Sequence, residues 1–168
     1  MPRLLVPVDG SPNSQHAVWH VLDEFRKDPA TEIHVLNVQA PFSSYVSRFS
    51  GKRNRAAFHR AEAEKALKPM RQLMNSRGVP YVVHTGIGNK ARMIADTARR
   101  LQCDHIVMST ARKNSLTRML ENSVTIQVLE LTKVPVKVIS GDAISRWERY
   151  GIPAGVGAVV GSLLLSNL

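Results

Sequence analysis

The chain has 168 residues, of which 43% are hydrophobic, and it carries a formal net charge of +10. This length supports one domain with a hydrophobic core and is short for two. The single cysteine, Cys103, excludes an intrachain disulfide framework, and its place before an apolar run predicts a small buried side chain, not a reactive thiol. No charged-then-apolar leader opens the sequence, so we expect a cytoplasmic protein. The positive charge favours anionic partners and does not bear on the fold.

Short apolar runs alternate with segments of helical periodicity along the chain. The predicted strands are residues 3–8, 32–38, 81–85, 105–109 and 134–139. The predicted helices begin after Ser11, with Pro12 in the first turn and an end near residue 28, and then cover residues 55–76, 89–101 and 123–131. Pro69 is expected to kink the second helix or to split off its last turns.

This alternation predicts an α/β domain: a five-stranded parallel sheet with helices on both faces, joined by right-handed crossovers. In such sheets, ligands bind beyond the carboxyl ends of the strands, near the point where the strand order reverses. Asp9, Val38 and the residues from Met108 onward follow three of the predicted strands. We therefore expect them to meet at one edge of the sheet.

Two motifs at opposite ends of this pattern point to a family. Residues 6–11 read VPVDGS, and residues 134–139 read VPVKVI after a helix. The chain resembles the universal stress protein family, whose members begin with a VPVDGS-like strand and end with a CPVLVV-like strand, over roughly residues 1–140. The resemblance implies the adenine nucleotide alpha hydrolase-like fold for a domain at residues 1–141. Residues 142–168 would then form a basic and aromatic linker followed by an apolar, glycine-rich tail.

The family's nucleotide loop is altered in this chain. Nucleotide-binding members carry, after the fourth strand, a glycine, two residues, a second glycine, nine residues, and a third glycine followed by serine or threonine. By resemblance, the nucleotide-site positions here are Asp9, Val38, Met108, Ser109, Arg112, Asn122, Ser123 and Val124, and the three glycine positions hold Ser109, Arg112 and Asn122. Losing a glycine strains a backbone that needs positive φ and places a Cβ in the phosphate cradle.

We therefore predict a non-enzymatic stress-response or protein-interaction domain with a degenerate nucleotide-binding loop and no bound cofactor. The first alternative is a regulator that binds ATP or another nucleotide through an atypical loop in which Arg112 contacts phosphate. Resemblance also implies a homodimer that pairs through strand 134–139, and other protein partners remain open.

No catalytic or metal-binding group of residues emerges. His16 and His20 stand four apart on a predicted helix, but no cysteine or third histidine has motif spacing with them. His34, His84 and His105 lie in or beside predicted strands and are interpreted as packing residues. Residues 41–60 interleave aromatic and basic side chains, as in some single-strand-binding proteins. We nevertheless favour a surface loop that binds no nucleic acid.

The last eighteen residues, 151–168, contain no charge. As a helix they would span about 27 Å at roughly 1.5 Å per residue, just short of a bilayer core of roughly 30 Å. Their glycines have the spacing of helix contacts in lipid, and Trp147 and Tyr150 precede them. The second alternative is therefore a membrane-associated adaptor that uses this tail. A tail packed on the protein or across a dimer is the soluble alternative.

Overall fold

A computed structural model describes residues 1–43, 51–112 and 123–143 of the chain. It contains a five-stranded, all-parallel sheet with the strand order β3-β2-β1-β4-β5. The strands are β1 (Arg3–Pro7), β2 (Glu32–Gln39), β3 (Val82–Ile87), β4 (His105–Arg112) and β5 (Val136–Ala143). The predicted fold class is therefore confirmed. The order reverses between β1 and β4, which are neighbours in the sheet but far apart in sequence.

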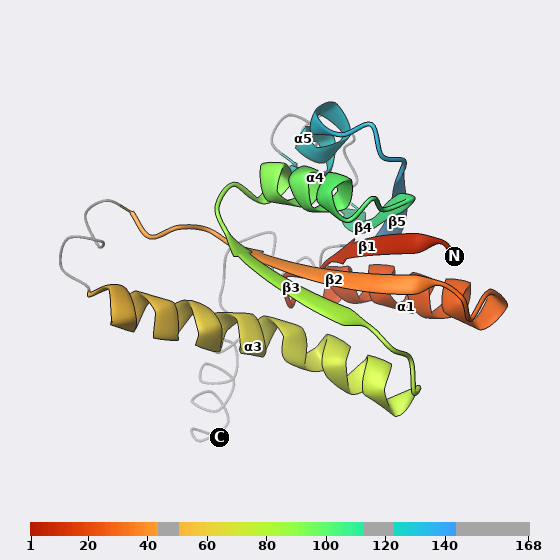
Figure 1. Ribbon diagram of the computed structural model, residues 1–168, viewed down its shortest axis with the longest axis horizontal. Helices are drawn as coiled ribbons and strands as arrows, with labels where there is room; N and C mark the ends of the chain where they lie inside the picture. The colour runs from red at the N-terminus through yellow and green to blue at the C-terminus, as the bar shows by residue number, and fades with distance from the viewer. Residues whose placement is uncertain (44–50, 113–122, 144–168) are drawn as a thin grey trace, which may run out of the picture.

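Four helices cover the two faces of the sheet (Figure 1). Helices α1 (Pro12–Lys27) and α3 (Lys52–Ser76) lie on one face, and α4 (Lys90–Arg100) and α5 (Val124–Leu131) lie on the other. Alternate residues of β1 supply the two cores: Leu4 and Val6 pack with α1 and α3, whereas Leu5 packs with α4 and α5. A strand buried on both faces reads as a continuous apolar run, which explains the LLV of β1.

Capping side chains define where three helices begin. Ser11, Asn89 and Ser123 accept hydrogen bonds from the backbone N–H groups of Ser14, Arg92 and Ile126, at 3.2, 3.0 and 3.2 Å. Each bond satisfies a donor that the first helical turn leaves unpaired. These polar caps follow β1, β3 and the 113–122 segment, so helix starts lie at the carboxyl edge of the sheet.

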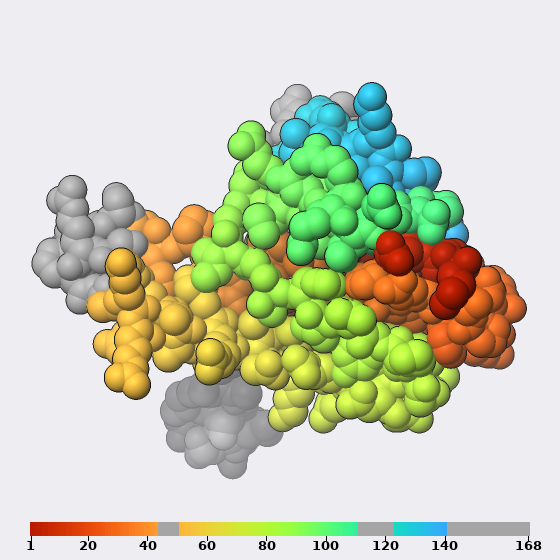
Figure 2. Space-filling model, viewed as in Figure 1, coloured from red at the N-terminus to blue at the C-terminus, as the bar shows by residue number. Residues whose placement is uncertain are grey.

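Helix α3 corrects one sequence-based prediction. It begins at Lys52, earlier than the predicted residue 55, and runs without interruption through Pro69 to Ser76, so Pro69 does not split off its last turns. A proline inside a helix costs about 3 kcal/mol. Leu67, Met70 and Met74 are almost fully buried on both sides of the proline. Burial contributes about 1.5–3 kcal/mol for each such side chain, which outweighs the proline penalty. Figure 2 shows the atoms of α3 as a long ridge along the lower side of the molecule.

Strand β4 is longer than predicted. It extends beyond residue 109 to Arg112 and pairs with β5, with Ser109 opposite Ile139 and Arg112 opposite Ala143 after a register shift. Two positions that the family resemblance places in a glycine loop, Ser109 and Arg112, therefore lie in extended strand backbone. Without glycine, this backbone has little access to positive φ, and pairing with β5 satisfies its polar groups.

Among the described residues, no helix is both long and apolar enough to cross a bilayer. The membrane hypothesis rests on residues 151–168, which lie outside the described part of the chain. The same holds for most of the predicted linker and tail segment that begins at residue 142.

Candidate functional site

A pocket of about 360 Å³ opens at the carboxyl ends of the central strands. It lies where the strand order reverses between β1 and β4, which is where open parallel sheets bind ligands. Its volume falls at the lower end of the range for small-molecule sites, roughly 300–1,000 Å³. The pocket is lined by Pro7, Val8, Asp9, Ser11, Asn13, Ser14, Leu36, Val38, Lys90, Ile94, Met108, Ser109, Val124 and Thr125.

Apolar side chains from two strands and two helices form its inner wall. Leu36 and Val38 come from β2, Met108 from β4, Ile94 from α4 and Val124 from α5. Val38 and Met108 are 8% and 7% exposed, so they belong to the core and are held by packing on α4. A wall of this kind suits a flat, largely apolar group such as an aromatic ring.

Asp9 lies at the mouth of the pocket in the turn between β1 and α1. Its Oδ1 accepts hydrogen bonds from the backbone N–H of Ser11 at 3.0 Å and from the Ser11 hydroxyl at 2.6 Å. Partial burial acts to raise the pKa of Asp9, but the Ser11 hydrogen bonds and smaller contributions from Ser14 and Lys90 outweigh it, so the pKa is lowered. The carboxylate therefore stays ionised and both supports the turn and faces the pocket.

Gly10 allows this turn to lie close against α3. Its φ is +82°, in the left-handed region that favours glycine. A Cβ at this position would lie 2.8 Å from the Cα of Ala66 on α3. The glycine of the VPVDGS motif is therefore required both by the backbone conformation and by the close approach of a helix.

Ser109 ties the end of β4 to the start of α1. Its hydroxyl donates a hydrogen bond to the backbone carbonyl of Asn13, and both residues line the pocket. The family's first loop glycine would leave this space open, but here a side chain occupies it. A polar cross-link between β4 and α1 therefore lies at the pocket, at the position that the resemblance assigns to the first loop glycine.

Five of the eight nucleotide-site positions inferred from the sequence line this one pocket: Asp9, Val38, Met108, Ser109 and Val124. Ser123, next to it, caps α5 through the N–H of Ile126 at 3.2 Å and is not a lining residue. Asn122 and the side chain of Arg112 lie outside the described part of the structure, so the alternative in which Arg112 contacts phosphate stays a prediction.

Lys90 is a pocket residue that sequence reasoning missed. It is the first residue of α4 and is the only lysine or arginine among the lining residues that the structure describes. It forms none of the ion pairs found within residues 1–43, 51–112 and 123–143. The signal that could have found it is its place just after the third strand, at the edge of the sheet where the other site residues lie.

The described residues contain no group of three or more histidine, cysteine or acidic side chains that could hold a metal ion. Cys103 is 6% exposed, as predicted, and burial raises the pKa of its thiol to about 11. In the basic and aromatic segment, the rings of Phe42 and Phe58 lie 5.2 Å apart and both contact His59. Residues 44–50, at the centre of that segment, lie outside the described part.

The sequence profile of the Universal stress protein family matches residues 1–140 of the chain. The chain belongs to the universal stress protein family. Universal stress protein MJ0531 of Methanocaldococcus jannaschii is 29% identical over 141 residues, which cover 82% of this chain and 81% of that protein. The resemblance inferred from the VPVDGS motif and the final strand is therefore confirmed.

Solved universal stress proteins share the fold. One, in complex with cAMP, superimposes with a TM-score of 0.61 at 17% identity and covers 82% of this chain and 96% of that one. Another, At3g01520 of Arabidopsis thaliana with AMP bound, has a TM-score of 0.60 at 15% identity and covers 92% of this chain and 97% of that one. At these identities the likeness establishes the fold, and the nucleotides named are those of the relatives.

Proposed function

We propose that this universal stress protein is a non-enzymatic regulator that binds a small adenine nucleotide with one phosphate, in preference to ATP, in the pocket at the β1–β4 switch point. One observation carries the proposal. The pocket has an apolar wall and the carboxylate of Asp9, which suit a nucleoside. At the first two glycine positions of the family's loop, however, the chain forms extended strand, and Ser109 bonds to Asn13.

The nucleoside end fits the described residues. Val38, Met108 and Val124 offer apolar contact to a ring, and the ionised Asp9 offers acceptor oxygens to ribose hydroxyls. AMP and cAMP, which are bound to two relatives of the same fold, each carry a single phosphate. These relatives support the ligand class and do not by themselves assign it to this chain.

The phosphate end differs from the family's pattern. Polyphosphate cradles rely on backbone N–H groups that glycines bring close to the ligand. Among the described lining residues Lys90 is the one cation, and one ammonium can neutralise part of the charge of one phosphate but not of three. We infer that Lys90 contacts a single phosphate and that additional phosphates find no cradle among the described residues.

The non-enzymatic part of the proposal rests on the titratable groups. Asp9 and Lys90 are the charged side chains among the described lining residues, and no histidine or cysteine lines the pocket with them. Asp9 has a lowered pKa and accepts two hydrogen bonds from Ser11, so it is a poor general base at neutral pH. The arrangement suits binding without chemistry.

A pair of variants tests the role of Lys90. We expect Lys90→Gln to weaken AMP binding roughly five- to tenfold, because an exposed ammonium–phosphate contact contributes about 1 kcal/mol after solvent screening. Adenosine binding should not change. Arg92→Gln is the matched control, because Arg92 is exposed on the same helix and lines a different groove. Equal losses for AMP and adenosine in Lys90→Gln would contradict the assigned phosphate contact.

We also propose that the protein is a homodimer that pairs through β5, as the family resemblance implies. Strand β5 is an edge of the sheet, and Val138 on it is 43% exposed. The neighbouring Lys137 turns to the other face, where its ammonium lies 3.1 Å from Glu24 of α1. Within the described part of the chain no further strand pairs with β5, so an apolar side chain lies on an edge that a second copy of the chain can cover.

A further inference from the structure

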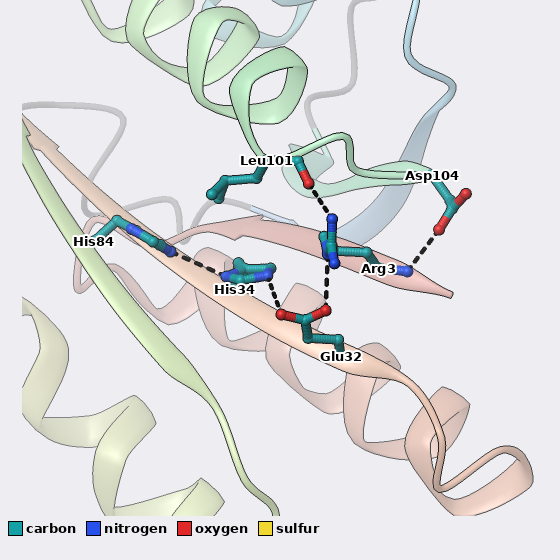
Figure 3. Close-up of polar contacts among 6 residues, drawn as sticks. All are labelled: Arg3, Glu32, His34, His84, Leu101 and Asp104. Atoms are coloured by element: carbon teal, nitrogen blue, oxygen red, sulfur yellow. Dashed lines mark hydrogen bonds and ion pairs between the residues drawn. The ribbon is translucent and has the colours of Figure 1, made fainter. Parts of the chain in front are cut away.

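Two histidines on neighbouring strands face each other on the side of the sheet that α4 covers (Figure 3). Nδ1 of His34 on β2 lies 3.0 Å from Nε2 of His84 on β3, and the ring centroids are 5.2 Å apart. His34 is 5% exposed and His84 is half-buried. Strand β3 is the edge of the sheet, so this contact joins its outermost strand to the interior.

The pair belongs to a chain of polar contacts that crosses three strands (Figure 3). Nε2 of His34 lies 2.9 Å from Oε1 of Glu32, within ion-pair distance but out of line for a hydrogen bond. Oε2 of Glu32 accepts a hydrogen bond from Nε of Arg3 at 2.8 Å. Arg3 on β1 donates in turn to the carbonyl of Leu101 at 2.6 Å, at the end of α4.

The position of Glu32 fixes how protons are arranged in the neutral pair. A bare lone pair on Nε2 of His34 would face a carboxylate oxygen, whereas an N–H at that nitrogen is attracted to it. With the proton on Nε2, Nδ1 of His34 is an acceptor. Nε2 of His84 must then donate, and one N–H links β3 to β2.

Adding protons to the pair has opposite effects in two steps. The first added proton leaves a single hydrogen between Nδ1 of His34 and Nε2 of His84, with the positive charge close to Glu32, and the link becomes a charge-assisted hydrogen bond. A second added proton gives both facing nitrogens a hydrogen. Neither nitrogen can then accept, and two imidazolium rings oppose each other with their facing nitrogens 3.0 Å apart.

The charged groups around the pair in the described part of the chain bear on that second step. Glu32 on β2 favours positive charge, while Arg3 on β1 and Arg100 at the end of α4 oppose it. Asp104 accepts the backbone N–H of Arg3 at 2.7 Å, and the Cys103 thiol beside it is protonated near neutral pH. Burial first, and then the charges of His34 and Arg100, lower the pKa of His84.

We propose that the His34–His84 pair is an acid-sensitive link, which holds the edge strand β3 on the sheet when the pair carries at most one added proton and releases it when the pair carries two. The backbone ladder between β2 and β3 remains in the released state, so release loosens β3 without detaching it. Strand β3 leads directly into α4, whose Lys90 and Ile94 line the pocket at the carboxyl ends of the strands. Acid thus weakens the support of one pocket wall.

The sign of the pH effect follows from the direction of the His84 shift. A histidine with a lowered pKa in the folded state binds its proton less readily there than in the unfolded chain, where the pKa is about 6.5. The unfolded state then takes up more protons as the pH falls below that value. The contribution of His84 to the stability of the folded state is therefore complete above pH 6.5 and is lost progressively on acidification.

A set of glutamine variants tests the link. Urea unfolding is measured from pH 8 to pH 5 for the native chain, for His84→Gln and for His105→Gln. Glutamine can donate from the position of Nε2 and does not titrate. We expect the native chain and His105→Gln, which keeps the pair, to show the same drop in unfolding midpoint below pH 6.5. We expect His84→Gln to lose most of that drop. An equal drop in all three proteins overturns the proposal.

Imidazole nitrogen chemical shifts of the native protein provide a second measurement that needs no variant. We expect two unequal titration steps, with protection of β3 amides from hydrogen exchange, corrected for intrinsic rates, decreasing only in the second. If the two rings titrate independently at the same pH, or if β3 protection follows neither step, the link does not exist.

Discussion

Replacing Gly10 by alanine is expected to destabilise the domain for two separable reasons. The first is backbone strain, because alanine at φ +82° costs about 1 kcal/mol relative to glycine. The second is overlap, because the new Cβ would lie 2.8 Å from Cα of Ala66, a backbone atom that cannot rotate away. Overpacking of this kind costs about 1–3 kcal/mol. The expected total is about 2–4 kcal/mol, a large part of a typical stability of about 5–15 kcal/mol.

Gly78 provides the matched control for this experiment. Its φ is +65°, but a Cβ there would meet no atom within 4 Å. Gly78→Ala should therefore show the strain alone, about 1 kcal/mol. Both variants are compared with the native chain by urea unfolding, in which a difference of about 2 kcal/mol moves the midpoint by roughly 1 M. Equal losses in the two variants would refute the close approach of the β1–α1 turn to α3.

Two further predictions concern a buried thiol and an open edge. Burial raises the pKa of the Cys103 thiol to about 11. Its reaction with a thiol reagent at pH 8 should therefore be slow in the native protein and fast in urea. Equally fast reaction under both conditions would contradict the burial of this residue. Val138→Glu should shift the protein from dimer to monomer in analytical ultracentrifugation. Val82→Glu, at a similarly exposed position on the opposite edge strand β3, should leave the dimer intact. A native protein that is monomeric at all concentrations would contradict the proposed pairing through β5.

Local patterns in the sequence predicted most of the fold. The run from Val6 to Pro12 contains a buried strand, a turn aspartate, a glycine, a serine cap and a proline at the helix start, and each has that role in the structure. These features depend on neighbours in the chain, so periodicity and capping rules reach them. The same rules placed Asp9, Val38 and Met108 at one edge, because parallel strands bring their carboxyl ends together.

Features that depend on distant segments were not predicted. The Ser109 bond to Asn13 joins residues 96 positions apart, and the extension of β4 to Arg112 depends on pairing with β5. His34 and His84 meet only because the β2–β3 register sets Leu36 opposite His84, and a one-residue shift would separate the rings. The split of the helix at Pro69 was predicted wrongly, because burial of the residues around it, which the local pattern does not measure, keeps the helix continuous.

The most direct test of the central claim is calorimetric titration of the native protein with AMP and, separately, with ATP and magnesium at the same ionic strength. From the Ser109–Asn13 bond, and from Lys90 as the one cation among the described lining residues, we predict that AMP binds in the micromolar range and that ATP binds at least tenfold more weakly. ATP binding as tight as AMP binding would contradict the account, since it would require a polyphosphate cradle. No detectable AMP binding at millimolar concentration would contradict it equally.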